Sequence, residues 1–267
     1  MKATTLTYSK EEGGKHMTDD QRIPRTVHYC WFGYGEKPRM VKKCMESWQK
    51  HLTGYTFIEW NERKFDVSSH PFVREAYEAK KYAFVSDYVR LTALLEEGGI
   101  YMDTDVEVLK PLDPLLEKNA FTGFEDDTFL QSGTLGFAKG HDLIKYFLSY
   151  YENKHFTNKD GSLNMKTNTS LMTSQCLQFG LIQNGQYQVL NNGVEVFPRT
   201  YFSPYDYING ESFINEESYT IHHYAQTWLP ASTRFKSSVK RAASKLIGPK
   251  AIAAVRNAIS PSGGGTK

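Results

Sequence analysis

Two aspartates, Asp103 and Asp105, follow an apolar run in the stretch GGIYMDTDVEVL, residues 98–109. The run Ile100–Met102 predicts a buried strand, and both carboxylates can reach one cation if the strand ends there. Oxygen ligands suit Mn²⁺ or Mg²⁺, which commonly share them with the phosphates of a nucleotide. Such a cation would stabilise the charge of a departing diphosphate. The alternative for so short a pattern is a surface turn with two solvated acids.

A second charged pair, Asp87 and Arg90, precedes this strand on a predicted helix. Residues three apart lie on one face of a helix, and an exposed pair of this kind contributes little to stability. This pair is embedded in apolar residues, where an arginine can hold a phosphate or sugar and an aspartate can accept a hydrogen bond from a hydroxyl. We therefore interpret both residues as ligand-binding.

The segments that must position these residues alternate between strands and helices. The stretches 27–32 and 55–60 predict strands on either side of a helix over 39–51, which is the start of a doubly wound α/β sheet. Ligands of open α/β sheets bind beyond the carboxyl ends of the strands. Both aspartates are therefore expected at the ligand site.

The later elements follow from the same patterns. A helix is predicted from Pro71 to about Lys80, and another, capped by Ser86, over 87–97, where two glycines end it. The stretch NTSLMTSQCL is expected to start a helix beside the acceptor cleft, capped by Thr169 or Ser170. The remaining predicted elements are helices over 142–151 and 170–179 and strands near 187–197 and 218–224.

The composition fits one catalytic domain. The chain has 267 residues, of which 40% are hydrophobic, enough for an α/β domain with a helical annex. Its cysteines, Cys30, Cys44 and Cys176, are too few and too scattered for a disulfide framework or a metal knuckle. No apolar run approaches the roughly 18 residues that span a bilayer, and the start of the chain lacks the apolar core of a secretory signal. We therefore expect a cytoplasmic protein.

The charge is unevenly distributed along the chain. The net charge is +2, but residues 231–267 hold eight basic residues and no acid, which leaves 24 basic and 30 acidic residues elsewhere. This balance disfavours nucleic acid as a partner, and no nucleic-acid-binding motif appears. The basic segment has apolar residues at helical spacing, which suits either peripheral contact with an anionic membrane or a solvated helix packed on protein. We expect a disordered leader (1–20), a catalytic domain (21–230) and a basic amphipathic helical tail (231–267).

Three stretches of the sequence together resemble one known family. The segment S-D-x-x-R, then L, then G-G-I-Y-x-D-x-D is similar to the sugar-binding region of glycosyltransferase family 32, and also to the core of the clostridial glucosylating toxins. IPRTVHYCWFG (23–33) resembles the first strand of the family. YTIHHYAQTWL (219–229) resembles its closing H-H-x-x-x-S-W, with Thr227 in place of the usual serine. The resemblance spans about residues 22–230.

The resemblance implies a GT-A fold, which is an α/β fold with a mixed, mostly parallel sheet flanked by helices. It also implies retaining transfer of a hexose from a nucleotide sugar. Trp31 would then stack on the base, although a tryptophan by itself is more typical of a core. Asp87 and Arg90 would contact the sugar and ribose region. Asp105 would bind the metal, and Asp103 would touch ribose, sugar and metal.

The closing motif supplies two adjacent histidines. His222 or His223, with Trp228, would close over the diphosphate, and adjacent side chains of a strand point to opposite faces. Between the motifs, the segments 125–127 and 131–133 could face the sugar or acceptor. The predicted site residues are Asp87, Arg90, Asp103 and Gln131 as catalytic, Trp31, Asp87, Arg90, Tyr101, Asp103, His223 and Trp228 as donor-binding, and Asp103, Asp105, His222 and His223 as metal ligands.

Two other functions fit parts of the sequence. A haloacid-dehalogenase-type phosphatase also has an apolar strand followed by D-x-D-x-T/V, with an aspartate nucleophile, an aspartate acid/base and Mg²⁺. That motif normally lies on the first strand of the chain, and the downstream lysine and acidic pair are not evident here. A non-catalytic carbohydrate-binding protein would have no physical reason to keep buried carboxylates together.

We therefore predict a metal-dependent, retaining glycosyltransferase of the GT-A type. It would use Mn²⁺ or Mg²⁺ and a nucleotide sugar, with a UDP-sugar favoured. Its acceptor would be a saccharide or lipid-linked saccharide, as in the synthesis of capsular or surface polysaccharide at the inner face of the cell membrane. No nucleophile is evident in the sequence, so front-face departure and attack is favoured over two displacements through the enzyme.

Overall fold

The structure is a computed structural model that describes residues 22–207 and 210–225. The predicted leader (1–20), Trp228 and the predicted tail (231–267) lie outside these ranges, and so do both predicted domain boundaries. Among the described residues, no helix is long and apolar enough to cross a membrane.

Strands and short helices alternate through the described chain. In order, the elements are β1 (Thr26–Cys30), α1 (Arg39–His51), β2 (Thr56–Trp60), α2 (Pro71–Glu78), α3 (Tyr82–Glu97), β3 (Gly99–Met102), β4 (Val106–Val108), α4 (Asp113–Leu116), β5 (Ala120–Gly123), β6 (Thr134–Phe137), α5 (Asp142–Ser149), α6 (Asn168–Cys176), the 3₁₀ helix η2 (Leu177–Phe179), β7 (Gln188–Val189), β8 (Glu195–Phe197), α7 (Arg199–Phe202), β9 (Tyr205–Asp206), β10 (Glu211–Ser212) and β11 (Thr220–His222).

One seven-stranded sheet forms the centre of the molecule, in the order β2-β1-β3-β6-β5-β8-β7. Strands β1, β2, β3, β5 and β8 run in one direction, and β6 and β7 run against them. Two small antiparallel pairs, β9 with β10 and β4 with β11, lie outside this sheet. The mixed, mostly parallel sheet flanked by helices confirms the predicted GT-A type of fold.

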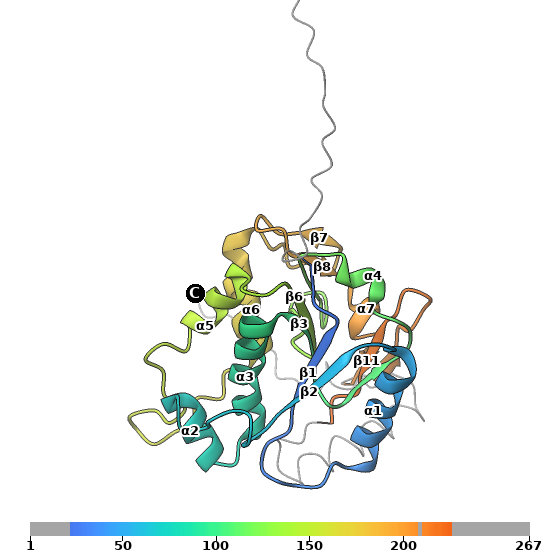
Figure 1. Cartoon of the computed structure of the whole chain (residues 1–267). Helices are drawn as coiled ribbons and strands as arrows, with labels where there is room; N and C mark the ends of the chain where they lie inside the picture. Colours follow the sequence, from blue (N-terminus) through green and yellow to red (C-terminus); the bar gives the residue numbers. More distant parts are fainter. Residues whose placement is uncertain (1–21, 208–209, 226–267) are drawn as a thin grey trace, which may run out of the picture.

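Helices cover the sheet on both sides (Figure 1). On one side, α2, α3, α5 and α6 bury apolar residues in a shared core that includes Phe72, Val89 and Leu171. On the other side, α1, α4 and α7 contribute Trp48, Leu115 and Phe202 to a second core. Burial on both faces explains why the central strand β3 is apolar along its whole length.

Two predicted helix caps were wrong. The helix before the aspartates begins at Tyr82, so Ser86 lies inside α3 and does not cap it. The Ser86 hydroxyl instead donates to the carbonyl of Tyr82 at 3.0 Å, a bond that serine often makes within a helix. Similarly, α6 is capped by Thr167, whose hydroxyl accepts from the N–H of Ser170, and not by Thr169 or Ser170.

A buried histidine of the first motif, residues 23–33, contacts the glycine pair that precedes the aspartates. His28 on β1 is fully buried, and its Nε2 lies 2.8 Å from the carbonyl oxygen of Gly98. Its Nδ1 accepts a hydrogen bond from Nε1 of Trp60 at 3.1 Å. A Cβ at Gly99, where φ is +107°, would lie 2.7 Å from the carbonyl oxygen of Thr26, so only glycine permits this close approach.

We expect His28→Ala to lower the free energy of unfolding by about 2–4 kcal/mol, because two buried polar groups lose their partner. Burial lowers the pKa of His28 below its usual 6.5, so the folded protein keeps this histidine neutral. The contribution of His28 is therefore full above about pH 6.5 and is lost as the pH falls below that value. Denaturant unfolding between pH 5 and 8 checks both effects. His51→Ala, at a less buried histidine, should change stability by less than about 0.5 kcal/mol.

Candidate active site

The candidate active site lies at the carboxyl ends of two neighbouring parallel strands. Strand β1 ends at Cys30 and β3 ends at Met102, and the two strands pair side by side. A turn follows β3, in which the N–H of Val106 donates to the carbonyl of Asp103 at 3.0 Å. This turn lies at a pocket of about 630 Å³, a volume typical of small-ligand sites.

Hydrogen bonds orient both aspartates of the turn. Oδ1 of Asp103 accepts from the Tyr101 hydroxyl at 2.8 Å and lies 3.3 Å from a guanidinium nitrogen of Arg90. Oδ2 of Asp105 accepts from the N–H of Ala225 at 2.7 Å. Each carboxylate is therefore held by one oxygen, which leaves the second oxygen available to another group.

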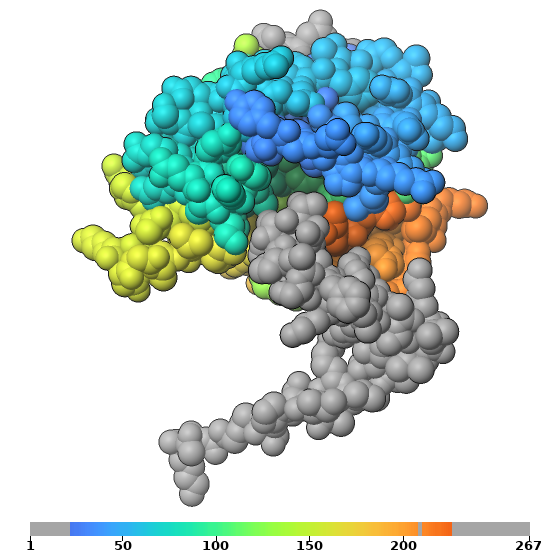
Figure 2. All heavy atoms as spheres, turned by 90° about the horizontal axis from the view of Figure 1, so that it is seen from below, coloured from blue at the N-terminus to red at the C-terminus, as the bar shows by residue number. Residues whose placement is uncertain are grey.

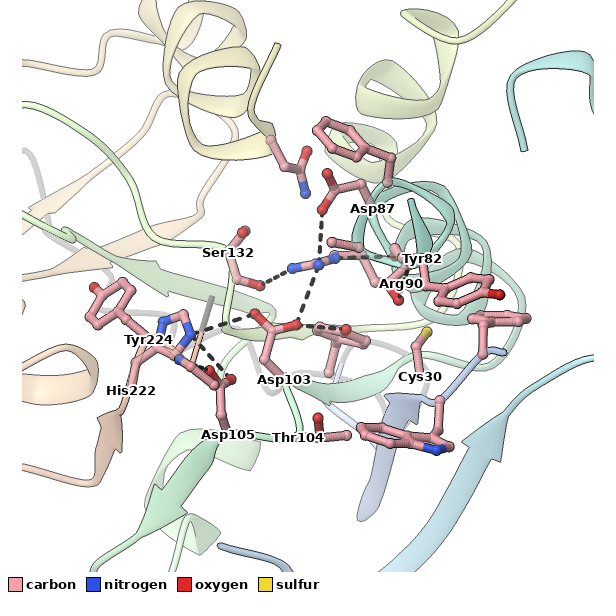
Figure 3. A pocket seen from close by; sticks show the side chains of 18 of the residues that line it. Cys30, Tyr82, Asp87, Arg90, Asp103, Thr104, Asp105, Ser132, His222 and Tyr224 are labelled. Atoms are coloured by element: carbon pink, nitrogen blue, oxygen red, sulfur yellow. Dashed lines mark hydrogen bonds and ion pairs between the residues drawn. The ribbon is translucent and has the colours of Figure 1, made fainter. Parts of the chain in front are cut away.

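A distant strand brings a histidine to these free oxygens. Strand β11 pairs antiparallel with β4, with His222 opposite Val106. Nε2 of His222 consequently lies 3.3 Å from Oδ1 of Asp105 and 3.9 Å from Oδ2 of Asp103. Figure 3 shows the three side chains converging from the turn and the strand.

The three side chains fit a divalent cation. Asp103, Asp105 and His222 each offer one ligand atom, and these atoms lie within 4.8 Å of one another. The other ring nitrogen of His222 is buried and has no hydrogen-bond partner among the described residues. Two carboxylate oxygens with one imidazole nitrogen suit a metal such as Mn²⁺.

The charges of the cluster reinforce one another in the absence of a cation. Burial lowers the pKa of His222, but the neighbouring carboxylates, above all Asp105, outweigh burial and raise this pKa to about 9. Burial raises the pKa of Asp105, and His222 outweighs that effect, so the pKa of Asp105 falls to about 2. A bound cation would take the place of the proton on His222, since metal ligands must be deprotonated.

A buried arginine joins the helix α3 to the turn. The guanidinium of Arg90 is 4% exposed and contacts Asp87 at 2.9 Å and Asp103 at 3.3 Å. It also donates to the carbonyl of Ser132 at 2.7 Å and lies with its Cζ 4.5 Å from the centre of the Tyr101 ring. Burial raises the pKa of Asp87 to about 6, against the opposing attraction of Arg90.

Aromatic residues line the pocket on the β1 side. Trp31, Phe32, Tyr82 and Phe84 all contribute to the wall. The indole N–H of Trp31 donates to the carbonyl of Gly35 at 2.6 Å, and Nζ of Lys37 lies 5.4 Å from its ring centre. Cys30 and Tyr82 lie on the opposite side of the pocket from His222 and Tyr224, with Asp103 between them (Figure 3).

The structure brings most of the predicted site residues into this pocket. Trp31, Asp87, Arg90, Tyr101, Asp103, Asp105 and His222 all line it. His223 points elsewhere, with Nε2 2.8 Å from a carboxylate oxygen of Glu107. Gln131 is 1% exposed and does not line the pocket, since its amide bonds both the N–H and the carbonyl of Thr134. This amide holds the loop before β6.

Three residues of the site were predicted only as parts of longer segments and not singled out. Gly133 packs so closely on the cluster that a Cβ would lie 3.0 Å from Nδ1 of His222. The ring of Tyr224, whose backbone has φ +49°, stacks on His222 with ring centres 4.0 Å apart. Asn168 at the start of α6 lines the pocket at 4% exposure, and its amide has no hydrogen-bond partner among the described residues. The sequence predicts the segments 131–133 and 168–177 beside the sugar or acceptor, but it carries no signal for these individual contacts.

The pocket draws on segments far apart in the sequence. On the face seen in Figure 2, residues of the first hundred (blue to teal) lie along one side. Segments near residue 160 (yellow) and residues 200–225 (orange) lie along the other side. Fold and site together define the class of protein: an α/β domain of the GT-A glycosyltransferase type, with a D-x-D turn at the end of a central strand.

Part of the chain is similar to known glycosyltransferases. Residues 38–122 match the family described as "glycosyltransferase sugar-binding region containing DXD motif". The chain is 29% identical over 126 residues to inositol phosphoceramide mannosyltransferase 3 of Schizosaccharomyces pombe, covering 46% of this chain and 35% of that protein. It is 24% identical over 227 residues to an uncharacterised glycosyltransferase of Acanthamoeba polyphaga mimivirus, covering 78% and 84%. These matches support the resemblance of the chain to glycosyltransferase family 32.

The similarity covers only part of the curated relatives and extends to solved structures at low identity. The chain spans less than half the length of the fission-yeast mannosyltransferases that it matches. Among solved structures it is similar to the PaToxG glycosyltransferase, with 17% identity, a TM-score of 0.43, and coverage of 60% of this chain and 72% of the other.

Proposed function

We propose that this protein transfers a hexose from a nucleotide sugar to a saccharide or a lipid-linked saccharide, with retention of configuration. The observation that best supports this proposal is one cluster of three side chains. Asp103, Asp105 and His222 present ligand atoms within 4.8 Å at the end of β3, beside the buried Asp87–Arg90 pair in the same pocket. Similarity to mannosyltransferases and other glycosyltransferases supports it independently.

Each group in the pocket has a role in this proposal. A divalent cation on Asp103, Asp105 and His222 would supply Lewis-acid stabilisation of the charge that develops on the diphosphate. Arg90 holds Asp103 in its orientation, so the carboxylate does not need to reorganise during the reaction. Asp87 accepts a hydrogen bond from a hydroxyl of the donor sugar. The exposed part of the Trp31 ring stacks on the base.

The proposed route to retention is front-face departure and attack within one ion pair. Asp87 is paired with Arg90, and Asp103 and Asp105 would direct their free oxygens to the cation, so these three carboxylates are poorly placed to act as nucleophiles. The remaining one, Glu125, is the side chain on which a covalent intermediate would form in a double displacement. Mass spectrometry of the enzyme trapped during turnover should therefore detect no glycosylated Glu125.

Titration calorimetry tests the donor class before any sugar or acceptor is known. UDP and GDP are titrated into the protein with and without Mn²⁺. We expect UDP to bind in a metal-dependent manner, with at least tenfold weaker binding when Mn²⁺ is removed, because the cation links the diphosphate to the three ligands. Metal-dependent binding of GDP alone would replace UDP by GDP in the proposal. Binding of neither nucleotide would remove its main support.

A phosphatase is not favoured by the fold or the family match. The D-x-D turn follows β3 and not the first strand of the chain, and the Asp87–Arg90 pair has no part in a phosphatase mechanism. Phosphatase assays with Mg²⁺ are nevertheless the appropriate next step if no nucleotide binds.

We further propose that the protein works at the cytoplasmic face of a membrane, attached through residues 231–267. This proposal rests on the eight basic residues and the apolar spacing of that segment. Deletion of 231–267 should weaken co-sedimentation with vesicles that contain phosphatidylserine, and high salt should weaken it in the intact chain. Equal sedimentation of both proteins at low salt would contradict the proposal.

A further inference from the structure

One carboxylate of the pocket has no partner. Of the four that line it, Asp87, Asp103 and Asp105 each accept a hydrogen bond or form an ion pair. Within residues 22–207 and 210–225, no group donates a hydrogen bond to the side chain of Glu125 or forms an ion pair with it. Only its backbone N–H is engaged, by the carbonyl of Phe129 at 2.7 Å. A partly buried carboxylate without a donor is costly unless a ligand supplies one.

Glu125 lines the pocket and is close enough to His222 for the two charges to interact. It lies after β5, in the loop closed by the Phe124–Leu130 bridge. The charges of Asp126, Arg199 and Asp103 also act on Glu125, and its own charge acts on Tyr207 and Tyr224. His222 and Tyr224 face Cys30 and Tyr82 across the pocket (Figure 3). A nucleotide with its base on the aromatic wall and its diphosphate at the cluster would thus direct its sugar toward Glu125.

We propose that Glu125 binds the acceptor, and that it selects a neutral saccharide. This inference rests on the proposed transferase function. A carboxylate has two oxygens that can accept from two adjacent hydroxyls of one sugar ring. Tyr207, which lines the same part of the pocket, offers an aromatic ring to the C–H face of that sugar. An acidic sugar would instead place a second negative charge beside Glu125 and Asp126, which repels it.

The test measures acceptor binding separately from donor binding. Saturation-transfer NMR is recorded with methyl glycosides of glucose, galactose, mannose and glucuronic acid, in the presence of UDP and the diamagnetic cation Mg²⁺. We expect the intact chain to bind at least one neutral glycoside and to bind the glucuronide at least tenfold more weakly. Glu125→Gln should weaken the neutral glycoside at least tenfold while UDP binding, measured by calorimetry, stays within twofold. Asp127→Asn removes a charge from the same loop outside the pocket lining and should change neither.

The outcomes distinguish this inference from the proposed function. If the intact chain binds UDP but Glu125→Gln binds the glycosides equally well, or if no neutral glycoside binds, the acceptor role is wrong. A loss of UDP binding in Glu125→Gln would assign the residue to the donor, which also overturns the inference. If the intact chain binds no nucleotide at all, the transferase proposal fails, and the acceptor role fails with it. Glu125→Asp, which keeps the charge, replaces Glu125→Gln if that variant does not fold.

Discussion

Replacing Asp105 by alanine is expected to lower the rate of transfer by about a thousandfold or more. The variant loses one of the three proposed metal ligands, and Lewis-acid stabilisation of a leaving group contributes several kcal/mol to catalysis. UDP binding should become insensitive to Mn²⁺, because the diphosphate then has no fixed cation to bind. Turnover assays and calorimetry with and without Mn²⁺ measure these two effects separately.

Two further variants test whether the effect of Asp105→Ala comes from the loss of its negative charge. Asp105→Asn keeps an oxygen that can accept from the N–H of Ala225 but loses the negative charge. It should therefore fold like the intact protein and still lose Mn²⁺-dependent binding. Asp127→Ala, on an exposed loop position, should leave binding and turnover unchanged. An Asp105→Ala protein with full activity would show that this residue is not a metal ligand.

Replacing Arg90 by alanine should both abolish transfer and destabilise the fold by about 3–5 kcal/mol. The guanidinium is 4% exposed and is the partner of two carboxylates, so its removal leaves Asp87 and Asp103 partly buried without the cation that they share. The carbonyl of Ser132 also loses its donor. Denaturant unfolding without nucleotide measures the stability, and turnover at a temperature where the variant is folded measures the transfer.

A surface ion pair provides the matched control for Arg90. Lys145 and Asp142 are also three residues apart on a helix, at 2.8 Å, but both are largely exposed. Lys145→Ala should cost at most about 1 kcal/mol, because solvent screens such pairs. Arg90→Lys keeps the charge but cannot reach both carboxylates and the carbonyl of Ser132 at once, so an intermediate loss is expected. Equal stability losses for Arg90→Ala and Lys145→Ala would show that burial does not matter here.

The order of the elements around the site was predictable because the signals are local. Apolar runs and turn glycines predicted β1, β3 and the turn that carries Asp103 and Asp105, and the structure confirms them. The start of α3 was not predictable in this way. The residues before Ser86 are apolar and fit a helix as well as a loop, and only their packing against α2 and the sheet extends the helix back to Tyr82.

The roles of Gln131, Asn168 and Glu125 depend on contacts between segments that lie far apart in the sequence. Gln131 has the chemistry of a sugar-binding residue, but the structure buries it in a loop where its amide bonds only Thr134. Asn168 lies at the start of α6 and lines the pocket, although the helices α4 and α5 separate it from the two aspartates in the sequence. Glu125 looks like one of three equivalent acids in the sequence, yet it alone among them lines the pocket.

The sequence by itself determined the α/β class, the family resemblance and the end of a buried strand as the place of the two aspartates. Periodicity, glycines and short motifs encode these features within a few residues of one another. The tertiary structure alone decided which histidine joins the aspartates. His222 and His223 are adjacent and chemically identical, and the register of β11 on β4 directs His222 to the pocket and His223 to Glu107. A register shift of one residue would exchange the two side chains, since neighbours in a strand point to opposite faces.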